Sequence, residues 1–168
     1  MDVDIGIEED ARKRIAEGLA VLLGDTSVLY VKTLGYHWNV VGPMFQPLHL
    51  MFEEQYVELR EAMDLLAERI RALGGTAPGS YAELVRLASI ADEEGAPGPE
   101  EMVRRLVEAH EALIRAARPL VGTAEEADDV ATADLVTQRI SAHEKTAWML
   151  RSTLGWAPRW HAMENSEA

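Results

Sequence analysis

Four long amphipathic segments constrain this chain more than any other feature of its sequence. In each of them apolar residues recur at intervals of three and four, the period of a helix with one buried face. We find no convincing run of the apolar and polar alternation that marks a half-buried strand. The fold class is therefore predicted to be all-α, with helices expected at residues 8–35, 45–73, 99–121 and 127–154.

The connections between these helices are unequal in length. Gly74 and Gly75 end the second helix and Pro99 opens the third, so residues 76–97 form one long connection. Its middle, residues 81–90, has a helical pattern of its own, and we expect a short helix there. Four helices with one long crossover between the second and third match the ferritin-like type of four-helix bundle.

The length and composition limit the class of protein. A chain of 168 residues can bury one hydrophobic core, and we expect a single domain over residues 1–168, with terminal segments at 1–7 and 156–168. It has no cysteine, so His, Asp and Glu would hold any metal, which favours iron, manganese or zinc. The N-terminus lacks the basic start and apolar stretch of a signal peptide, and no segment approaches the roughly 20 apolar residues of a membrane span. We predict a cytoplasmic protein with no membrane partner.

The charge balance bears on the remaining partners. The formal net charge is −13, from 29 acidic and 16 basic residues. Such a surface repels nucleic acid and anionic lipid and concentrates cations. Metal ions therefore fit as partners better than DNA does.

Two pairs of metal-ligating residue types lie on the second helix. His49 and Glu53 are four residues apart, as are Asp64 and Glu68, and at 3.6 residues per turn all four fall within a roughly 100° sector. The two pairs lie about 15 residues apart, which is roughly 22 Å along the axis and beyond the reach of one metal ion. One copy of this helix cannot close the site.

A second copy of the chain can close it. A two-fold axis crossing the helix near residues 57–60 would bring His49 and Glu53 opposite Asp64 and Glu68 of the other copy, giving two equivalent sites per dimer. His37, at the end of the first helix, would complete the histidine-rich half. The Glu-x-x-His motifs of an intrabundle di-iron site are absent, because no histidine follows a glutamate by three residues.

The same residues resemble those of a known family. The run from His37-Trp38 to Leu48-His49, followed by residues 53–56, 64–70 and 73–75, is similar to the ferroxidase signature of the Dps mini-ferritins. Residues 143–151 are similar to the last helix of that family. The resemblance implies a hollow homododecamer that oxidises Fe(II), stores ferric mineral and protects against oxidative stress. The family usually has Asp where this chain has Glu53, whose reach is longer by one methylene.

The ligand types and the resemblance together predict how iron is handled. His37, with Asp64 and Glu68 of the other copy, is expected to hold the first iron, and His49 with Glu53 the second. Zinc is the expected competing metal. Paired irons would deliver two electrons to hydrogen peroxide together, so peroxide is the expected oxidant and oxygen the alternative.

Several further residues have two interpretations. Trp38 is either a sink for stray oxidising equivalents or an aromatic anchor of the dimer interface. Acidic residues near the start of the last helix either line an iron-uptake pore at a three-fold axis or only favour the helix dipole: Asp128, Asp129 and Asp134. Acidic residues of the second helix either nucleate mineral or form a solvated face: Glu54, Glu58 and Glu61.

The remaining histidines and methionines are assigned more simply. His110 and His143 are expected to be structural, while His161, in the C-terminal tail, binds metal or nothing. Met51 and Met63 are expected to pack in an interface rather than to ligate haem.

Two rival functions stay open. Many Dps relatives coat the chromosome through Lys-rich termini, but here both termini are acidic and the basic run at residues 12–14 is short, so tight DNA binding is not expected. The other rival is a bundle that binds zinc or iron without turnover. Only kinetics separates that rival from a ferroxidase.

Overall fold

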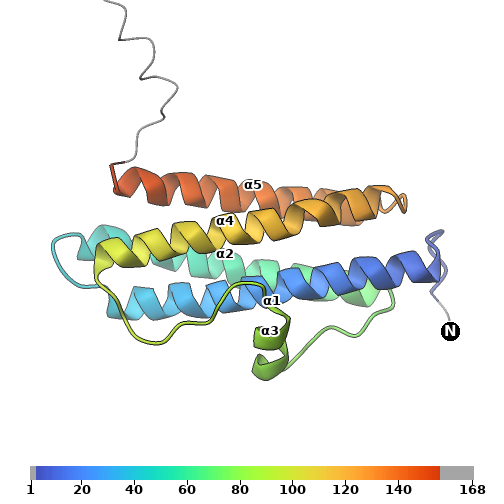
Figure 1. Ribbon diagram of the computed structural model, residues 1–168, viewed down its shortest axis with the longest axis horizontal. Helices are drawn as coiled ribbons and strands as arrows, with labels where there is room; N and C mark the ends of the chain where they lie inside the picture. Colours follow the sequence, from blue (N-terminus) through green and yellow to red (C-terminus); the bar gives the residue numbers. More distant parts are fainter. Residues whose placement is uncertain (1–2, 156–168) are drawn as a thin grey trace, which may run out of the picture.

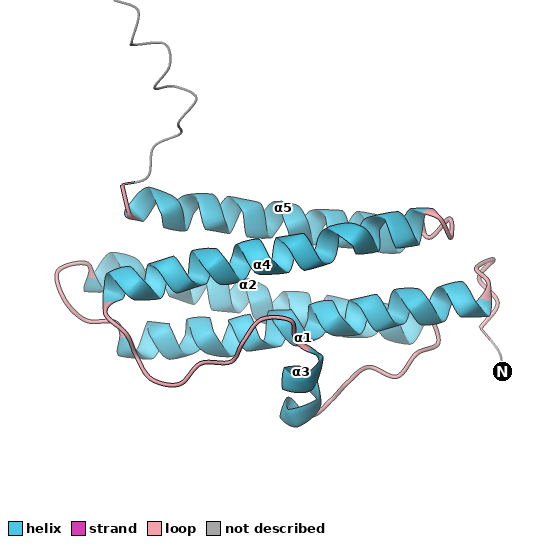
Figure 2. Ribbon diagram, in the orientation of Figure 1, coloured by secondary structure: helices cyan, strands magenta, loops and turns pink. Residues whose placement is uncertain are grey.

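Five helices account for most of the chain (Figures 1 and 2). The computed structural model describes residues 3–155, so His161 and the tail from residue 156 lie outside the described residues. The helices are α1 (Glu9–Asn39), α2 (Phe45–Ala72), α3 (Tyr81–Leu87), α4 (Pro99–Glu125) and α5 (Val130–Thr153), and the described part of the chain has no strand. The all-α prediction is confirmed. None of the helices in this part of the chain is long and apolar enough to cross a membrane.

The four long helices form two antiparallel hairpins that lie side by side, α1 with α2 and α4 with α5 (Figure 1). The connection from α2 to α4 returns along the length of the bundle, so these two helices run in the same direction. Short α3 lies on this connection and packs on the outside of α1. This is the bundle with one crossover that the loop lengths predicted.

The inward faces of all four long helices supply the core. Each fully buried aliphatic or aromatic side chain contributes roughly 1.5–3 kcal/mol to folding. The largest of them are less than 2% exposed: Phe52, Ile15, Leu19, Leu29, Leu59, Leu66, Ile70, Met102, Leu106, Leu113 and Leu150.

Helix ends differ from the expected positions where local contacts override the sequence signals. Helix α1 runs through Gly35 to Asn39, which places His37 in its last turn. Helix α5 begins at Val130 rather than near residue 127, because Asp128 has a positive φ of 56° and Asp129 caps the helix by accepting from Thr132 N at 2.9 Å. Helix α4 continues past Gly122 to Glu125.

Asp25, a fully buried carboxylate of α1, fastens the middle of the crossover. It accepts hydrogen bonds from Ser89 N (2.5 Å), Ser89 Oγ (2.8 Å) and Ile90 N (3.0 Å). These bonds hold residues 88–90 outside the helical conformation, so α3 ends at Leu87 instead of residue 90. A Cβ at neighbouring Gly24 would lie 2.7 Å from Leu84 O, so only glycine lets α3 approach this closely.

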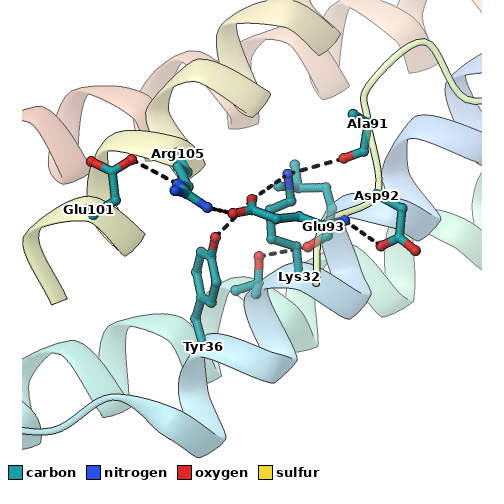
Figure 3. A network of polar contacts seen from close by, with 9 residues as sticks. Lys32, Tyr36, Ala91, Asp92, Glu93, Glu101 and Arg105 are labelled. Atoms are coloured by element: carbon teal, nitrogen blue, oxygen red, sulfur yellow. Dashed lines mark hydrogen bonds and ion pairs between the residues drawn. The ribbon is translucent and has the colours of Figure 1, made fainter. Parts of the chain in front are cut away.

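Glu93, on the crossover, makes a second set of polar contacts that hold the crossover beside the end of α1 (Figure 3). Tyr36 OH donates to Glu93 Oε2 at 3.1 Å, Lys32 Nζ lies 3.5 Å from the same oxygen, and Arg105 of α4 forms an ion pair with the carboxylate. Burial raises the pKa of the Tyr36 phenol and lowers the pKa of Lys32. The residue before His37 is thereby tied to both the crossover and α4.

Candidate metal centre

His37 and His49 form a stacked pair between the end of α1 and the first turns of α2. Their ring centroids are 3.8 Å apart and their planes differ by 17°. Each ring also bonds to the backbone of the other residue, with His37 Nδ1 lying 2.9 Å from His49 O and His49 Nδ1 lying 2.8 Å from His37 O. The side chain of each histidine thus bonds to the backbone of the other across the turn between α1 and α2.

These two hydrogen bonds select the tautomer of both rings. A carbonyl oxygen can only accept, so each Nδ1 carries the proton and donates, which leaves each Nε2 with a free lone pair. A backbone carbonyl at Nδ1 is the usual support for a histidine that ligates a metal through Nε2. Both rings therefore have the tautomer that a histidine bound to metal through Nε2 requires.

Two aromatic rings hold the histidine pair in place. Phe45 stacks on His49 with centroids 5.0 Å apart, and Tyr56 meets His37 edge-on at 5.2 Å. Tyr30 packs edge-on against Tyr56 at 6.3 Å. The sequence alone did not reveal the contacts that Phe45 and Tyr56 make with the two histidines. Their positions, four before His49 and seven after it, lie on its side of the helix.

The carboxylates predicted as ligands do not gather around one metal position within the chain. Glu53, Asp64 and Glu68 are all exposed on α2. Within residues 3–155, no three His, Asp or Glu side chains are grouped so that they could hold one metal ion. Within one chain the His37–His49 pair and the exposed carboxylates of Asp64 and Glu68 are therefore separate, and a shared site between two copies stays a prediction.

Exposed apolar side chains accompany these half-sites. Trp38 is 69% exposed, and Leu50 and Leu65 of α2 are 48% and 51% exposed. Trp38 also lines a groove between α1 and α3 together with Tyr30 and Tyr81. An apolar surface next to incomplete ligand sets is typical of a surface covered by another chain.

Comparison with known proteins agrees with this geometry. The model of the ferritin-like domain matches residues 16–159. A DNA protection during starvation protein of Brevibacillus brevis is 40% identical over 127 residues, 76% of this chain and 85% of that protein. The chain belongs to the ferritin-like family, as a Dps mini-ferritin.

Other relatives extend the same match. An uncharacterized low temperature-induced protein of Nostoc sp. is 41% identical over 158 residues, covering 93% of this chain and 88% of that protein. The crystal structure of the Dps protein of Vibrio cholerae, described as a ferritin-like diiron-carboxylate protein, superposes with a TM-score of 0.87 at 32% identity, over 92% of this chain and 98% of that one. DpsC from Streptomyces coelicolor gives a TM-score of 0.89 at 28% identity, over 94% of this chain and 93% of that one.

In this Dps chain one of the predicted pore residues has a different role. Asp129 is 2% exposed and bonds to Arg69 Nη2 at 2.6 Å and to Thr132. Burial alone would raise its pKa, but the hydrogen bonds from Arg69 and Thr132 outweigh burial and hold the pKa below its usual value. Its carboxylate is committed to the α5 cap and is not available to a pore. Asp128 and Asp134 are exposed and stay candidates.

The three glutamates considered for mineral nucleation also differ in their contacts. Glu58 forms a two-pronged ion pair with Arg139 of α5, with Glu58 Oε2 at 3.0 Å from Arg139 Nη2. Its charge is therefore neutralised within the chain, which argues against nucleation. Glu54 and Glu61 are exposed on α2 and keep both interpretations.

His110 and His143 lie in the bundle core, as expected of structural histidines. Each is 1% exposed, and their Nδ1 atoms are 2.8 Å apart. Burial lowers the pKa of His110 to about 3, with a smaller contribution from Arg139, and burial also lowers the pKa of His143. Both rings are neutral at physiological pH. Their contact with Arg139 was not foreseen from the sequence.

Proposed function

We propose that this Dps chain is a ferroxidase and iron-storage subunit. In this proposal the chains assemble into a hollow homododecamer in the cytoplasm, oxidise Fe(II) at sites between subunits, preferably with hydrogen peroxide, and store the ferric product. The observation that carries the proposal is the stacked His37–His49 pair, with both Nδ1 atoms bonded to carbonyls and both Nε2 atoms free. Protection against oxidative stress follows from the consumption of Fe(II) and peroxide together.

The proposed site needs two copies of the chain. His37, with Asp64 and Glu68 of a second copy, would bind one Fe(II), and His49 with Glu53 would bind another. Imidazole and carboxylate ligands suit Fe(II), and zinc would compete for the same ligands. Two Fe(II) ions each lose one electron to one peroxide molecule, whose O–O bond breaks to give two hydroxide ions. Because both electrons arrive at the same site, no hydroxyl radical is released.

Mixed shells give a sharp test of the shared site. One variant carries His37→Ala and His49→Ala, and another carries Asp64→Asn and Glu68→Gln. Each alone should be inactive, but a mixed dimer has one intact site and one site lacking all four of these ligands. With random pairing, co-assembly in equal amounts should restore about a quarter of the wild-type rate of Fe(II) oxidation by peroxide.

The controls for this test are simple. In the control, the histidine variant is co-assembled with Glu61→Gln, which neutralises a glutamate on the same helix but keeps the proposed ligands. In an equal mixture half of the sites have both histidines, so the rate should not exceed about half of the wild-type rate. Absence of any restoration in mixed shells of normal size would show that the site lies within one chain. A rate in air equal to the rate with peroxide would make oxygen the oxidant.

Iron retention separates a ferroxidase from a bundle that only binds metal. The protein is loaded anaerobically with about two Fe(II) per chain, as for a two-metal site, and given half an equivalent of peroxide per iron. The proposal expects fast formation of ferric absorbance and iron that elutes with the protein. A rate equal to that of a protein-free blank would leave only the metal-binding function.

Tight DNA binding is not part of the proposed function. Two of the three residues of the short basic run have partners within the chain, since Lys13 pairs with Glu9 at 2.6 Å and Arg12 donates to Ile7 O at 2.5 Å. A net charge of −13 adds repulsion from the phosphate backbone. A gel shift at about 0.15 M salt should show no saturable binding below micromolar protein.

A further inference from the structure

A polar cluster runs from the surface of α2, where the Glu58 side chain is 45% exposed, into the core between α2, α4 and α5. It consists of Glu58, Arg139, His143 and His110. The Arg139 side chain is 7% exposed and contacts the Glu58 carboxylate with two nitrogens, while its Nη2 lies 3.4 Å from His143 Nε2. His143 in turn contacts His110 through their Nδ1 atoms at 2.8 Å.

The direction of each hydrogen bond in this cluster follows from Arg139. A guanidinium only donates, so His143 Nε2 must accept, and a neutral His143 then carries its proton on Nδ1 and donates it to His110 Nδ1. His110 is left with its proton on Nε2, and this buried atom has no hydrogen-bond partner among the described residues. Gln55, one helical turn from Glu58, likewise has a buried Oε1 without a partner in this part of the chain.

The atoms that face Arg139 are those that would bind a metal ion. A carboxylate and an imidazole nitrogen with a free lone pair converge on its guanidinium, and His110 supports His143 from behind, as a second residue supports a metal-ligating histidine. Cores of ferritin-like bundles are also where inward carboxylates and histidines hold paired metals. Here the positive charge at this position is a side chain of the protein.

We infer that Arg139 determines where this protein binds metal: its guanidinium takes the place of a divalent cation beside Glu58 and His143, and thereby keeps the bundle core closed to metal. Metal is left with the surface pair, His37 and His49. The inference concerns binding alone and holds whether or not the surface pair oxidises iron.

The test replaces Arg139 in a background without the surface pair. Arg139→Glu is introduced into the His37→Ala, His49→Ala protein, so that the new carboxylate and His143, four residues apart on α5, face Glu58 with three ligands in all. Calorimetric titration with Zn(II) should show one more ion bound per chain than in the parent protein. The affinity for this ion should be at least about tenfold higher than that of any residual binding by the parent. Adding His143→Leu should abolish the gain.

A second variant and a matched control keep the result decisive. Arg139→Gln removes the charge with little change of shape, and should gain weaker Zn(II) binding even if Arg139→Glu does not fold. Arg69→Gln breaks the comparable α2–α5 ion pair with Asp129, which has no histidine beside it, and should gain none. The inference is overturned if folded Arg139 variants bind no more Zn(II) than Arg69→Gln. It is equally overturned if the parent already binds an ion that His143→Leu removes.

Discussion

The molecule contains two histidine pairs that differ in almost every physical respect. His37, which is 9% exposed, and half-buried His49 stack face to face, and each donates from Nδ1 to a backbone carbonyl. His110 and His143 are buried, tilted by 51° and bonded to each other through Nδ1. The first pair leaves two lone pairs free, whereas the second has its remaining lone pair directed at a guanidinium.

The difference shows that the partner at Nδ1, rather than the presence of histidine, decides what a pair can do. A carbonyl fixes the proton on Nδ1 and makes Nε2 a ligand. When the partner at Nδ1 is a second imidazole, one Nδ1 donates and the other accepts. The ring whose Nδ1 accepts then carries its proton on Nε2. The outer pair is therefore suited to metal, and the inner pair to holding helices together.

Loss of the outer pair should have the largest effect on activity. With both His37 and His49 replaced by Ala, the rate of Fe(II) oxidation by peroxide should fall by about 100-fold or more, because the ligands are lost. The melting temperature should change little. Stopped-flow ferric absorbance and a thermal melt measure the two effects. Replacement of His110 and His143 by Leu is the control and should keep the rate; if it lost activity equally, the comparison would fail.

Acid should act on the inner pair. The pKa of His110 in the folded chain is about 3, against 6.5 for a solvated histidine, so the unfolded chain binds more protons between these values. The free energy of unfolding should therefore fall as the pH drops from about 6.5 toward 3, by up to roughly 1.4 kcal/mol for each pH unit. Melting temperatures across this range measure the effect. In the His110→Leu, His143→Leu variant the slope should be clearly smaller, and an identical slope would contradict the assignment.

Breaking the inner pair on one side should destabilise the fold more than replacing it whole. His143→Ala leaves a cavity and removes one hydrogen-bond partner from His110 and one from Arg139. This change should lower the free energy of unfolding by about 2–4 kcal/mol. The double replacement by Leu removes the unpaired donor as well and should be less harmful than this single change. Denaturant melts at pH 7 compare them, and the reverse order would refute this view.

The smallest expected effect concerns the support of the outer pair. Phe45→Ala removes the ring that stacks on His49, an interaction worth about 0.5–1.5 kcal/mol. Zn(II) affinity should weaken a few-fold while the pH dependence of stability stays the same. Ile5→Ala, an exposed apolar residue before α1 that is 48% exposed, is the control and should bind Zn(II) as the wild type does. Equal losses in both variants would show that the stack contributes nothing specific.

Local patterns were sufficient to predict the helices and to place two candidate ligands on one face of α2. The end of α2, the crossover and its short helix follow from Gly74, Gly75, Pro99 and the apolar periodicity, and the spacing of His49 and Glu53 places them on one face. The reciprocal bonds of His37 and His49 span only 12 residues across one turn. They depend on a turn geometry that the residue pattern alone does not define.

Contacts between distant segments could not be predicted from these patterns. His110 and His143 are 33 residues apart on the two helices of one hairpin, and Arg139 and Glu58 are 81 residues apart on different hairpins, so these contacts depend on how the helices pack. The same holds for Asp129, whose pairing with Arg69 removed it from the predicted pore. The sequence does not show which charged residues have a partner on the other hairpin, as Asp129 and Glu58 do.

The division into two hairpins also has a consequence for the order of folding. Contacts within α1–α2 and within α4–α5 are formed across short turns, so each hairpin can close early with little loss of chain entropy. Contacts at Asp25 and Glu93 hold the crossover on the first hairpin, and those at Arg69 and Arg139 join the two hairpins; they link residues 57 to 81 positions apart. We therefore expect docking of the hairpins to be late and slow, and variants at Arg69 and Arg139 to act on it rather than on helix formation.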